Sequence, residues 1–143
     1  MGTRTDHREQ LTVSRHSTGV ATLVLAALMA VVLTACGGSA GPAITKVDAG
    51  TAVAMLDART VIDVRTPQEF AAGHLAGAQN VDVEAADFAS KIASLDKGAP
   101  YLVYCHSGRR SAIAAAQMAT AGFTDIVDGG AMAELVAAGA PTQ

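Results

Sequence analysis

The feature that most constrains the fold of this chain is the alternation of short apolar runs with helical segments after residue 43. Residues 60–64 (TVIDV) are largely β-branched, and residues 101–104 (YLVY) are wholly apolar. Strands that are apolar on both faces belong to parallel sheets that helices cover from both sides. We therefore predict an α/β domain with three layers, whose central parallel sheet has about five strands.

Shorter signals complete this pattern. The sequence from Thr66 to Glu69 combines a capping box with a proline at the first helical position, so a helix is predicted to begin at Thr66. Asp48 can cap another helix. The remaining predicted elements are strands over 44–47 and 126–127, an extended piece over 79–83, and helices over 88–95, from about Ser111 to Gly122, and over 132–138.

The first 43 residues differ from the rest and predict an exported protein. Residues 1–35 have an arginine-containing start and then a long charge-free run, as in a secretory signal. Residues 33–36 (LTAC) resemble the lipobox of bacterial lipoproteins. That resemblance implies a lipid on Cys36, a flexible tether over 36–43 and a folded domain over 44–143. The alternative is an uncleaved signal anchor. Either one places the domain on the outer face of the bacterial cytoplasmic membrane.

Charge and cysteine usage exclude several classes of function. The net charge is −3, and residues after Cys36 contain no run of Lys or Arg, which argues against a nucleic-acid partner. The chain has only two cysteines. If the lipid occupies Cys36, Cys105 has no partner, so the domain is neither a disulfide scaffold nor a dithiol oxidoreductase with a resolving cysteine.

The candidate site is the segment 105–111 (CHSGRRS), between the predicted strand 101–104 and the following helix. In a parallel sheet, ligands bind at the carboxyl ends of strands. A loop of this length can direct backbone N–H groups towards the sulfur, and Gly108 supplies the freedom for a tight curl. The helix N-terminus and the pair Arg109-Arg110 favour a thiolate, so Cys105 is predicted to be a nucleophile.

This loop, C-x-x-G-x-R, resembles the active-site loop of single-domain rhodaneses. Further motifs resemble those of the family in the same order, so that the resemblance covers nearly the whole chain after the tether. They are Asp63-Val64-Arg65 with Glu69, residues 73–78 (GHLAGA) with Asn80, Gly122-Phe123, and residues 128–130 (DGG).

The resemblance implies a sulfurtransferase, expected to be a monomer. Cys105 would take a sulfane sulfur from thiosulfate or a persulfide donor and pass it to a thiol acceptor, or to cyanide, with no metal or organic cofactor. Asp63, Arg65 and Glu69 would support the strand end beside the loop. The expected substrate-binding residues are His106, Ser107, Gly108, Arg109, Arg110 and Ser111.

Two alternatives stay open. The family usually has a Trp in its last helix, where this chain has Leu135, which leaves room for a non-catalytic module that binds persulfides or anions. The second alternative is a Cys-dependent phosphatase or arsenate reductase. Those enzymes need C-x5-R to encircle a tetrahedral oxyanion, whereas Cys105 and Arg110 form the shorter C-x4-R, which favours sulfur.

Overall fold

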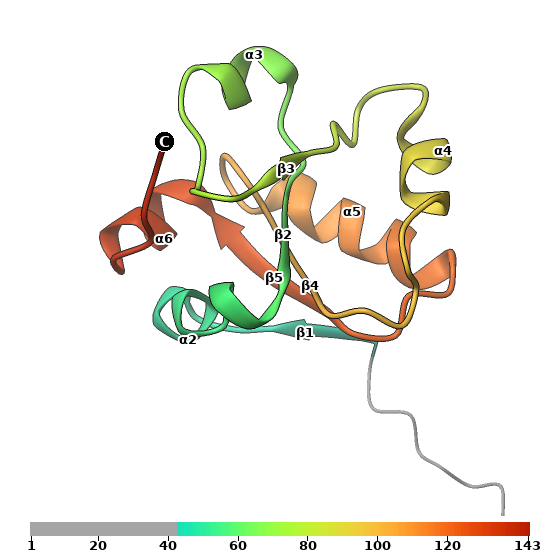
Figure 1. Cartoon of the computed structure of the whole chain (residues 1–143), viewed down its shortest axis with the longest axis horizontal. Coiled ribbons are helices and arrows are strands. Elements are labelled where there is room, and N and C mark those ends of the chain that lie inside the picture. Colours follow the sequence, from blue (N-terminus) through green and yellow to red (C-terminus); the bar gives the residue numbers. More distant parts are fainter. Residues whose placement is uncertain (1–42) are drawn as a thin grey trace, which may run out of the picture. The chain divides into compact units, whose positions relative to one another are not determined.

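The computed structural model describes residues 43–143, in which five strands alternate with helices (Figure 1). The strands lie side by side in the order β1-β5-β4-β2-β3, and every pairing is parallel. This confirms the predicted parallel sheet. The strands are β1 (Ile44–Lys46), β2 (Thr60–Asp63), β3 (Gln79–Asn80), β4 (Tyr101–Cys105) and β5 (Ile126–Ala131).

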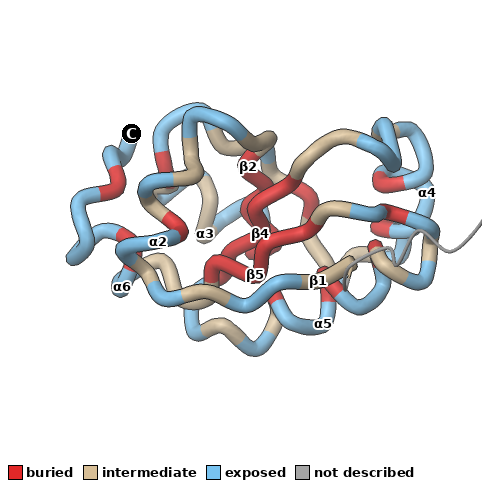
Figure 2. The backbone as a smooth tube through the Cα atoms, turned by 90° about the horizontal axis from the view of Figure 1, so that it is seen from below, coloured by how far each residue is buried: buried red, intermediate tan, exposed pale blue. Residues whose placement is uncertain are grey.

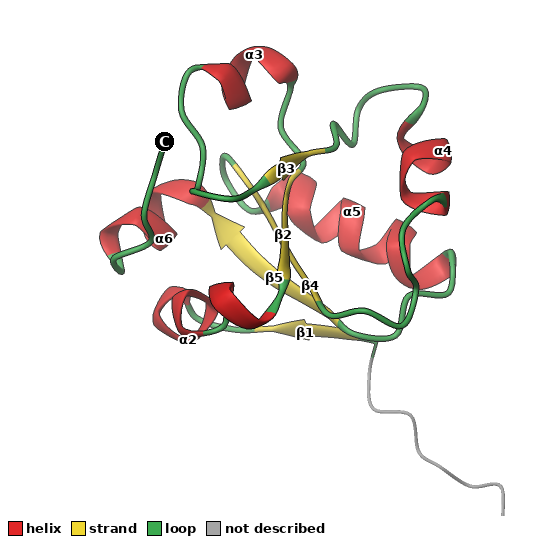
Figure 3. Ribbon diagram, viewed as in Figure 1, coloured by secondary structure: helices red, strands yellow, loops and turns green. Residues whose placement is uncertain are grey.

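Helices cover both faces of this sheet (Figure 3). They are α2 (Ala49–Ala54), the short 3-10 helix η1 (Leu56–Ala58), α3 (Pro67–Ala71), α4 (Phe88–Ala93), α5 (Arg109–Thr120) and α6 (Met132–Ala137). None of these helices combines the length and the apolar character needed to cross a membrane. The predicted signal peptide, Cys36 and all but the last residue of the tether lie outside the described residues.

Side-chain alternation along β4 divides the core into two clusters. Tyr101, Val103 and Cys105 face α4 and α5, whereas Leu102 and Tyr104 face α2 and α6. All five are buried, which is the reason that this segment is apolar throughout. Figure 2 shows the buried backbone gathered in β2, β4 and β5, with exposed residues mostly in the helices and loops around them.

Two helices, α2 and α3, begin at clear capping residues, and both begin where the sequence predicts. Asp48 accepts the backbone N–H of Thr51 at 3.0 Å and caps α2. At α3, Thr66 Oγ1 accepts the N–H of Glu69 at 3.3 Å, and Glu69 Oε2 accepts the N–H of Thr66 at 3.1 Å. Both bonds of the capping box are therefore present.

Several predicted boundaries differ from those of the structure. The helix α5 begins at Arg109 rather than near Ser111, because Gly108 takes the left-handed conformation that starts it. The strand β5 runs to Ala131 instead of ending at residue 127, with Gly129 forming a bulge against β4. The predicted extended piece 79–83 is present: Gln79–Asn80 form β3, and the N–H groups of Val81 and Val83 donate to the carbonyls of Asp63 and Val64 at 2.9 and 3.3 Å.

Glycine is required at this bulge. A Cβ on Gly129 would lie 2.9 Å from Leu102 Cδ2, and Gly130 has φ of +76°. These two residues let β5 continue past the irregularity so that Ala131 pairs with Cys105. The bulge thus brings β5 and the start of α6 beside the end of β4, where the candidate site lies.

Candidate active site

Cys105 is the last residue of β4, and its side chain is fully buried. The N–H of Gly108 donates a hydrogen bond to the Cys105 sulfur at 3.1 Å. Gly108 has φ of +85° and immediately precedes the 12-residue helix α5. The sulfur therefore lies at a helix N-terminus, where the backbone N–H groups and the helix dipole stabilise negative charge. A thiolate or a persulfide anion fits this environment.

Arg110 is held by a carboxylate from another helix. Its two terminal nitrogens donate to the two carboxylate oxygens of Glu69, each at 2.7 Å. These hydrogen bonds are the main reason that the pKa of Glu69 is lowered to about 2, and they raise the pKa of Arg110. Because Arg110 is 13% exposed and is paired in this bidentate way, it joins α3 to α5 rather than projecting into open solvent.

Arg109, by contrast, projects outward. Its side chain is 70% exposed, and its nearest carboxylate oxygen is Oε1 of Glu84 at 3.5 Å. Glu84 also approaches Arg110, with Oε2 at 3.6 Å from Nη1. Glu84 belongs to the loop between β3 and α4, so both loop arginines face a carboxylate that the sequence motifs did not single out.

Asp63 and Arg65 form a second, buried pair. Arg65 Nη2 donates to Asp63 Oδ2 at 2.6 Å and to the carbonyl of Gly73 at 2.8 Å. The hydrogen bonds to Asp63 raise the pKa of Arg65. The guanidinium also lies over the ring of Tyr104, 5.9 Å from its centroid. This pair ties the end of β2 to the segment after α3.

Tyr104 extends that support. Its hydroxyl accepts the N–H of Leu75 at 3.0 Å, and burial raises the pKa of the phenol. The Asn80 amide donates to the carbonyls of Asp63 and Arg65 at 3.1 and 2.8 Å. The backbone that follows β2 is therefore fixed by polar side chains that are themselves buried or half-buried.

Ser111 lies beneath the loop. Its hydroxyl lies 2.7 Å from Asp128 Oδ1 and 3.0 Å from the carbonyl oxygen of Gly108, so it can donate to either acceptor. Asp128 Oδ1 also accepts the N–H of Gly130 at 3.1 Å. Ser111 is fully buried, so its hydroxyl connects the start of α5 to the β5 bulge. Asp128 was not predicted as a site residue, although its position in the DGG motif was a signal.

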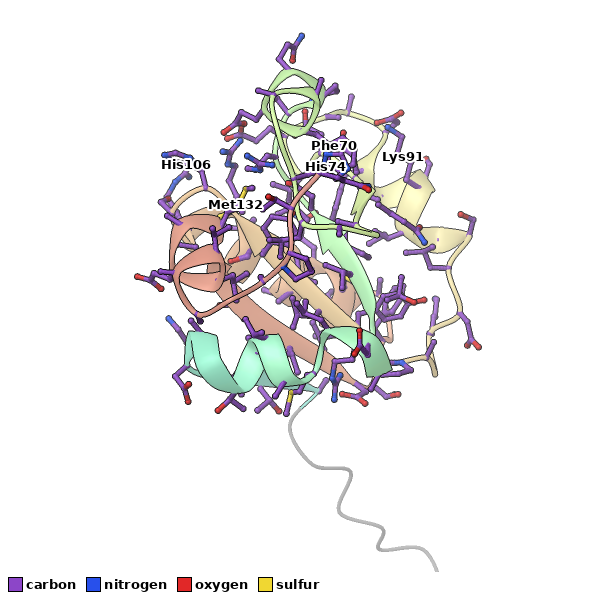
Figure 4. The ribbon with its side chains drawn as sticks, turned by 60° about the vertical axis from the view of Figure 1, so that its left-hand side comes forward. Phe70, His74, Lys91, His106 and Met132 are labelled. Carbon is purple, nitrogen blue, oxygen red and sulfur yellow. The ribbon has the colours of Figure 1, made fainter. Side chains whose placement is uncertain are left out.

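The remaining loop residues are on the surface. His106 and Ser107 are exposed, and Figure 4 shows His106 on the same side of the molecule as Met132, the first residue of α6. Leu135, one turn into α6, is fully buried and packs in the same cluster as Leu75 and Tyr104. The residue at the usual Trp position thus fills the core on the α6 side of the sheet.

Comparison with known proteins gives consistent results. The family model described as "Rhodanese-like domain" matches residues 48–133. A thiosulfate sulfurtransferase GlpE of Pseudomonas putida is 48% identical over 73 residues, which are 49% of this chain and 64% of that protein. The GlpE of a Pseudomonas aeruginosa strain is 44% identical over the same length. The match thus spans less than two thirds of these relatives.

Solved structures share the fold. The rhodanese-like domain of an Anabaena protein has a TM-score of 0.62 and 26% identity, covering 72% of this chain and 80% of that one. A rhodanese with anions from E. coli has a TM-score of 0.52 and 28% identity, covering 60% and 98%. Since the family model also spans more than half of the sequence, the chain belongs to the rhodanese-like domain family.

Proposed function

We propose that this protein is a sulfurtransferase in which Cys105 carries a sulfane sulfur as a persulfide. The observation that supports this most directly is the Cys105 sulfur at the N-terminus of α5, with the Gly108 N–H 3.1 Å away. A group that alternates between thiolate and persulfide stays anionic in both states. Fixed N–H donors stabilise both anions without a metal or an organic cofactor.

The proposed cycle has two displacements. The Cys105 thiolate attacks the outer sulfur of a donor such as thiosulfate, the sulfur–sulfur bond of the donor breaks, and sulfite leaves with the bonding electron pair. Cys105 then bears a persulfide anion. An acceptor thiolate, or cyanide, attacks the terminal sulfur, and the Cys105 thiolate is released. Neither step requires an external oxidant, reductant or proton.

The other site residues act around this sulfur. His106, Ser107 and Arg109 are exposed and form the outer edge of the loop, where a donor and an acceptor arrive. Gly108 presents its N–H to the sulfur. Arg110 is a positioning residue that acts through Glu69, and Ser111 positions the loop through Asp128. The short loop disfavours phosphate chemistry, because Cys105 and Arg110 are separated by four residues instead of five.

Mass spectrometry tests the cycle. The purified protein is incubated with thiosulfate, and its intact mass is recorded before and after cyanide is added. We expect a gain of about 32 Da, the mass of one sulfur atom, that cyanide removes as thiocyanate. Cys105→Ser is the control and should gain nothing. No gain in the unmodified protein, or an equal gain in Cys105→Ser, would refute the proposal. A gain that cyanide cannot remove would indicate a non-catalytic persulfide-binding module.

We further propose that the domain is exported and held at the outer face of the membrane by a lipid on Cys36. The motif at residues 33–36 and the short tether support this proposal. Membrane fractionation tests it, since Cys36→Ser should release the protein or leave an unprocessed precursor without lipid. A variant that stays in the membrane at the mobility of the unmodified protein would favour an uncleaved signal anchor.

A further inference from the structure

Both arginines of the Cys105 loop lie beside carboxylates. Glu69 binds Arg110 through both oxygens at 2.7 Å. Glu84 approaches Arg109 at 3.5 Å and Arg110 at 3.6 Å. A third carboxylate, that of Glu134, has its Oε2 atom 3.9 Å from the position that a Cβ on Gly130 would take.

Gly130 links this third carboxylate to the loop. A Cβ on Gly108 would lie 3.6 Å from the Gly130 Cα, so the start of α5 and the β5 bulge are in contact. Of these three carboxylates, Glu69 and Glu84 are the ones that contact the guanidinium groups of the loop. A small dianion that approaches the sulfur therefore meets arginines that already have anionic partners.

Glu84 differs from the other two acids in how little the fold depends on it. Its side chain is 53% exposed, and its contacts with the arginines are long. Glu69, in contrast, closes the capping box of α3. The backbone at Glu84 is nevertheless held in place, because its N–H donates to Asp82 Oδ1 at 2.9 Å. Glu84 thus places a charge at the loop while contributing little to stability.

We propose that Glu84 is a specificity-determining residue that disfavours dianionic sulfur donors. Its carboxylate competes with an incoming anion for Arg109 and repels that anion in proportion to its charge. The preferred donors are then sulfane compounds with at most one negative charge, such as a persulfide carried by a thiol, rather than thiosulfate. This inference rests on the proposed sulfurtransferase function and identifies its donor class.

Two sulfur donors of nearly the same shape but different charge distinguish an effect of charge from an effect of size. Thiosulfate is a dianion, and methanethiosulfonate replaces one of its oxygens with a methyl group and is a monoanion. Attack by the Cys105 thiolate on either breaks the donor sulfur–sulfur bond. The leaving group is sulfite in one case and methanesulfinate in the other, and both leave the same persulfide. The ratio of kcat/KM for the dianion to kcat/KM for the monoanion therefore measures how strongly the charges beside the Cys105 loop, such as Glu84 and Arg109, act on an incoming donor.

We expect Glu84→Gln to raise this ratio and Arg109→Gln to lower it. Two charges that face each other across roughly 8 Å of solvent-exposed surface change an association constant by about two- to threefold, so a change of this size is expected at low salt. High salt should reduce it, since surface charges are screened. Asp57→Asn is the matched control, because this exposed acid lies in η1, before the start of β2 and at the opposite end of the strands from Cys105.

The outcomes distinguish this inference from the proposed function. An unchanged ratio in Glu84→Gln, or an equal change in Asp57→Asn, overturns the role of Glu84 while sulfur transfer itself stands. A protein that gains no sulfur from either donor overturns sulfur transfer. Urea unfolding of Glu84→Gln should match that of the unmodified protein. A change in the kcat/KM ratio can then be attributed to the lost charge and not to a less stable fold.

Discussion

Replacing Glu69 with Gln tests the central ion pair of the site. Glutamine has the same size and can still accept the N–H of Thr66, so the capping box is retained. What is lost is the negative charge that holds Arg110 through two bonds of 2.7 Å. The substitution therefore removes the charge of the pair and one of its two hydrogen bonds to Arg110 while keeping the cap of α3.

The pKa of Glu69 gives the magnitude. A pKa lowered from 4.5 to about 2 corresponds to about 3 kcal/mol of folding free energy. The carboxylate is 33% exposed, so solvent screening reduces this to about 1–2 kcal/mol. Because the folded-state pKa is the lower one, this stability is present above pH 4.5. It is lost as the pH falls towards 2.

Urea unfolding across pH measures this loss. We expect Glu69→Gln to be less stable than the unmodified protein by about 1–2 kcal/mol at pH 7. The two stability curves should converge between pH 4.5 and about 2. Other carboxylates titrate in the same range, but they are present in both proteins and cancel in the difference. Two parallel curves, with a constant difference down to pH 2, would refute the electrostatic account of this pair.

Two further substitutions test the support beneath the loop. Gly129→Ala should destabilise the domain by about 1–3 kcal/mol in urea unfolding, because the added Cβ would lie 2.9 Å from Leu102 Cδ2. A Gly129→Ala protein of unchanged stability would show that the bulge can widen freely. Ser111→Ala should cost about 1–2 kcal/mol by the same measurement, since the buried Asp128 carboxylate loses a hydroxyl partner. Full stability of Ser111→Ala would contradict that hydrogen bond.

The parts of the fold that are set by residues close together in the sequence were predictable. The capping box at Thr66 and the apolar segment 101–104 each carry their signal within a few residues. The limits of α5 and β5 were not predictable in this way, because Gly108 and Gly129 owe their conformations to contacts with other segments. Glycine also has a low strand propensity, so the sequence after residue 127 does not indicate a continuing strand.

The same distinction, between residues that are close in the sequence and residues that folding brings together, applies to the candidate site. Cys105 and its loop were identified because strand, loop and helix are contiguous in the chain. The pairing of Arg110 with Glu69 joins residues 41 positions apart, and that of Ser111 with Asp128 joins residues 17 apart. Such partners are set by the packing of α3, α5 and β5. Glu84 lies in a loop outside every motif, so only the folded structure relates it to the arginines.

The full burial of Cys105 has a consequence for the rate at which it reacts. With no exposed surface, the sulfur can be attacked only after the atoms that cover it move aside. When that opening is slower than the chemical step, the rate of alkylation stops rising with reagent concentration and reaches a plateau equal to the opening rate. The side chains that hold the start of α5, Ser111 and Arg110, then limit the rate of this reaction, because they set how often the sulfur becomes available.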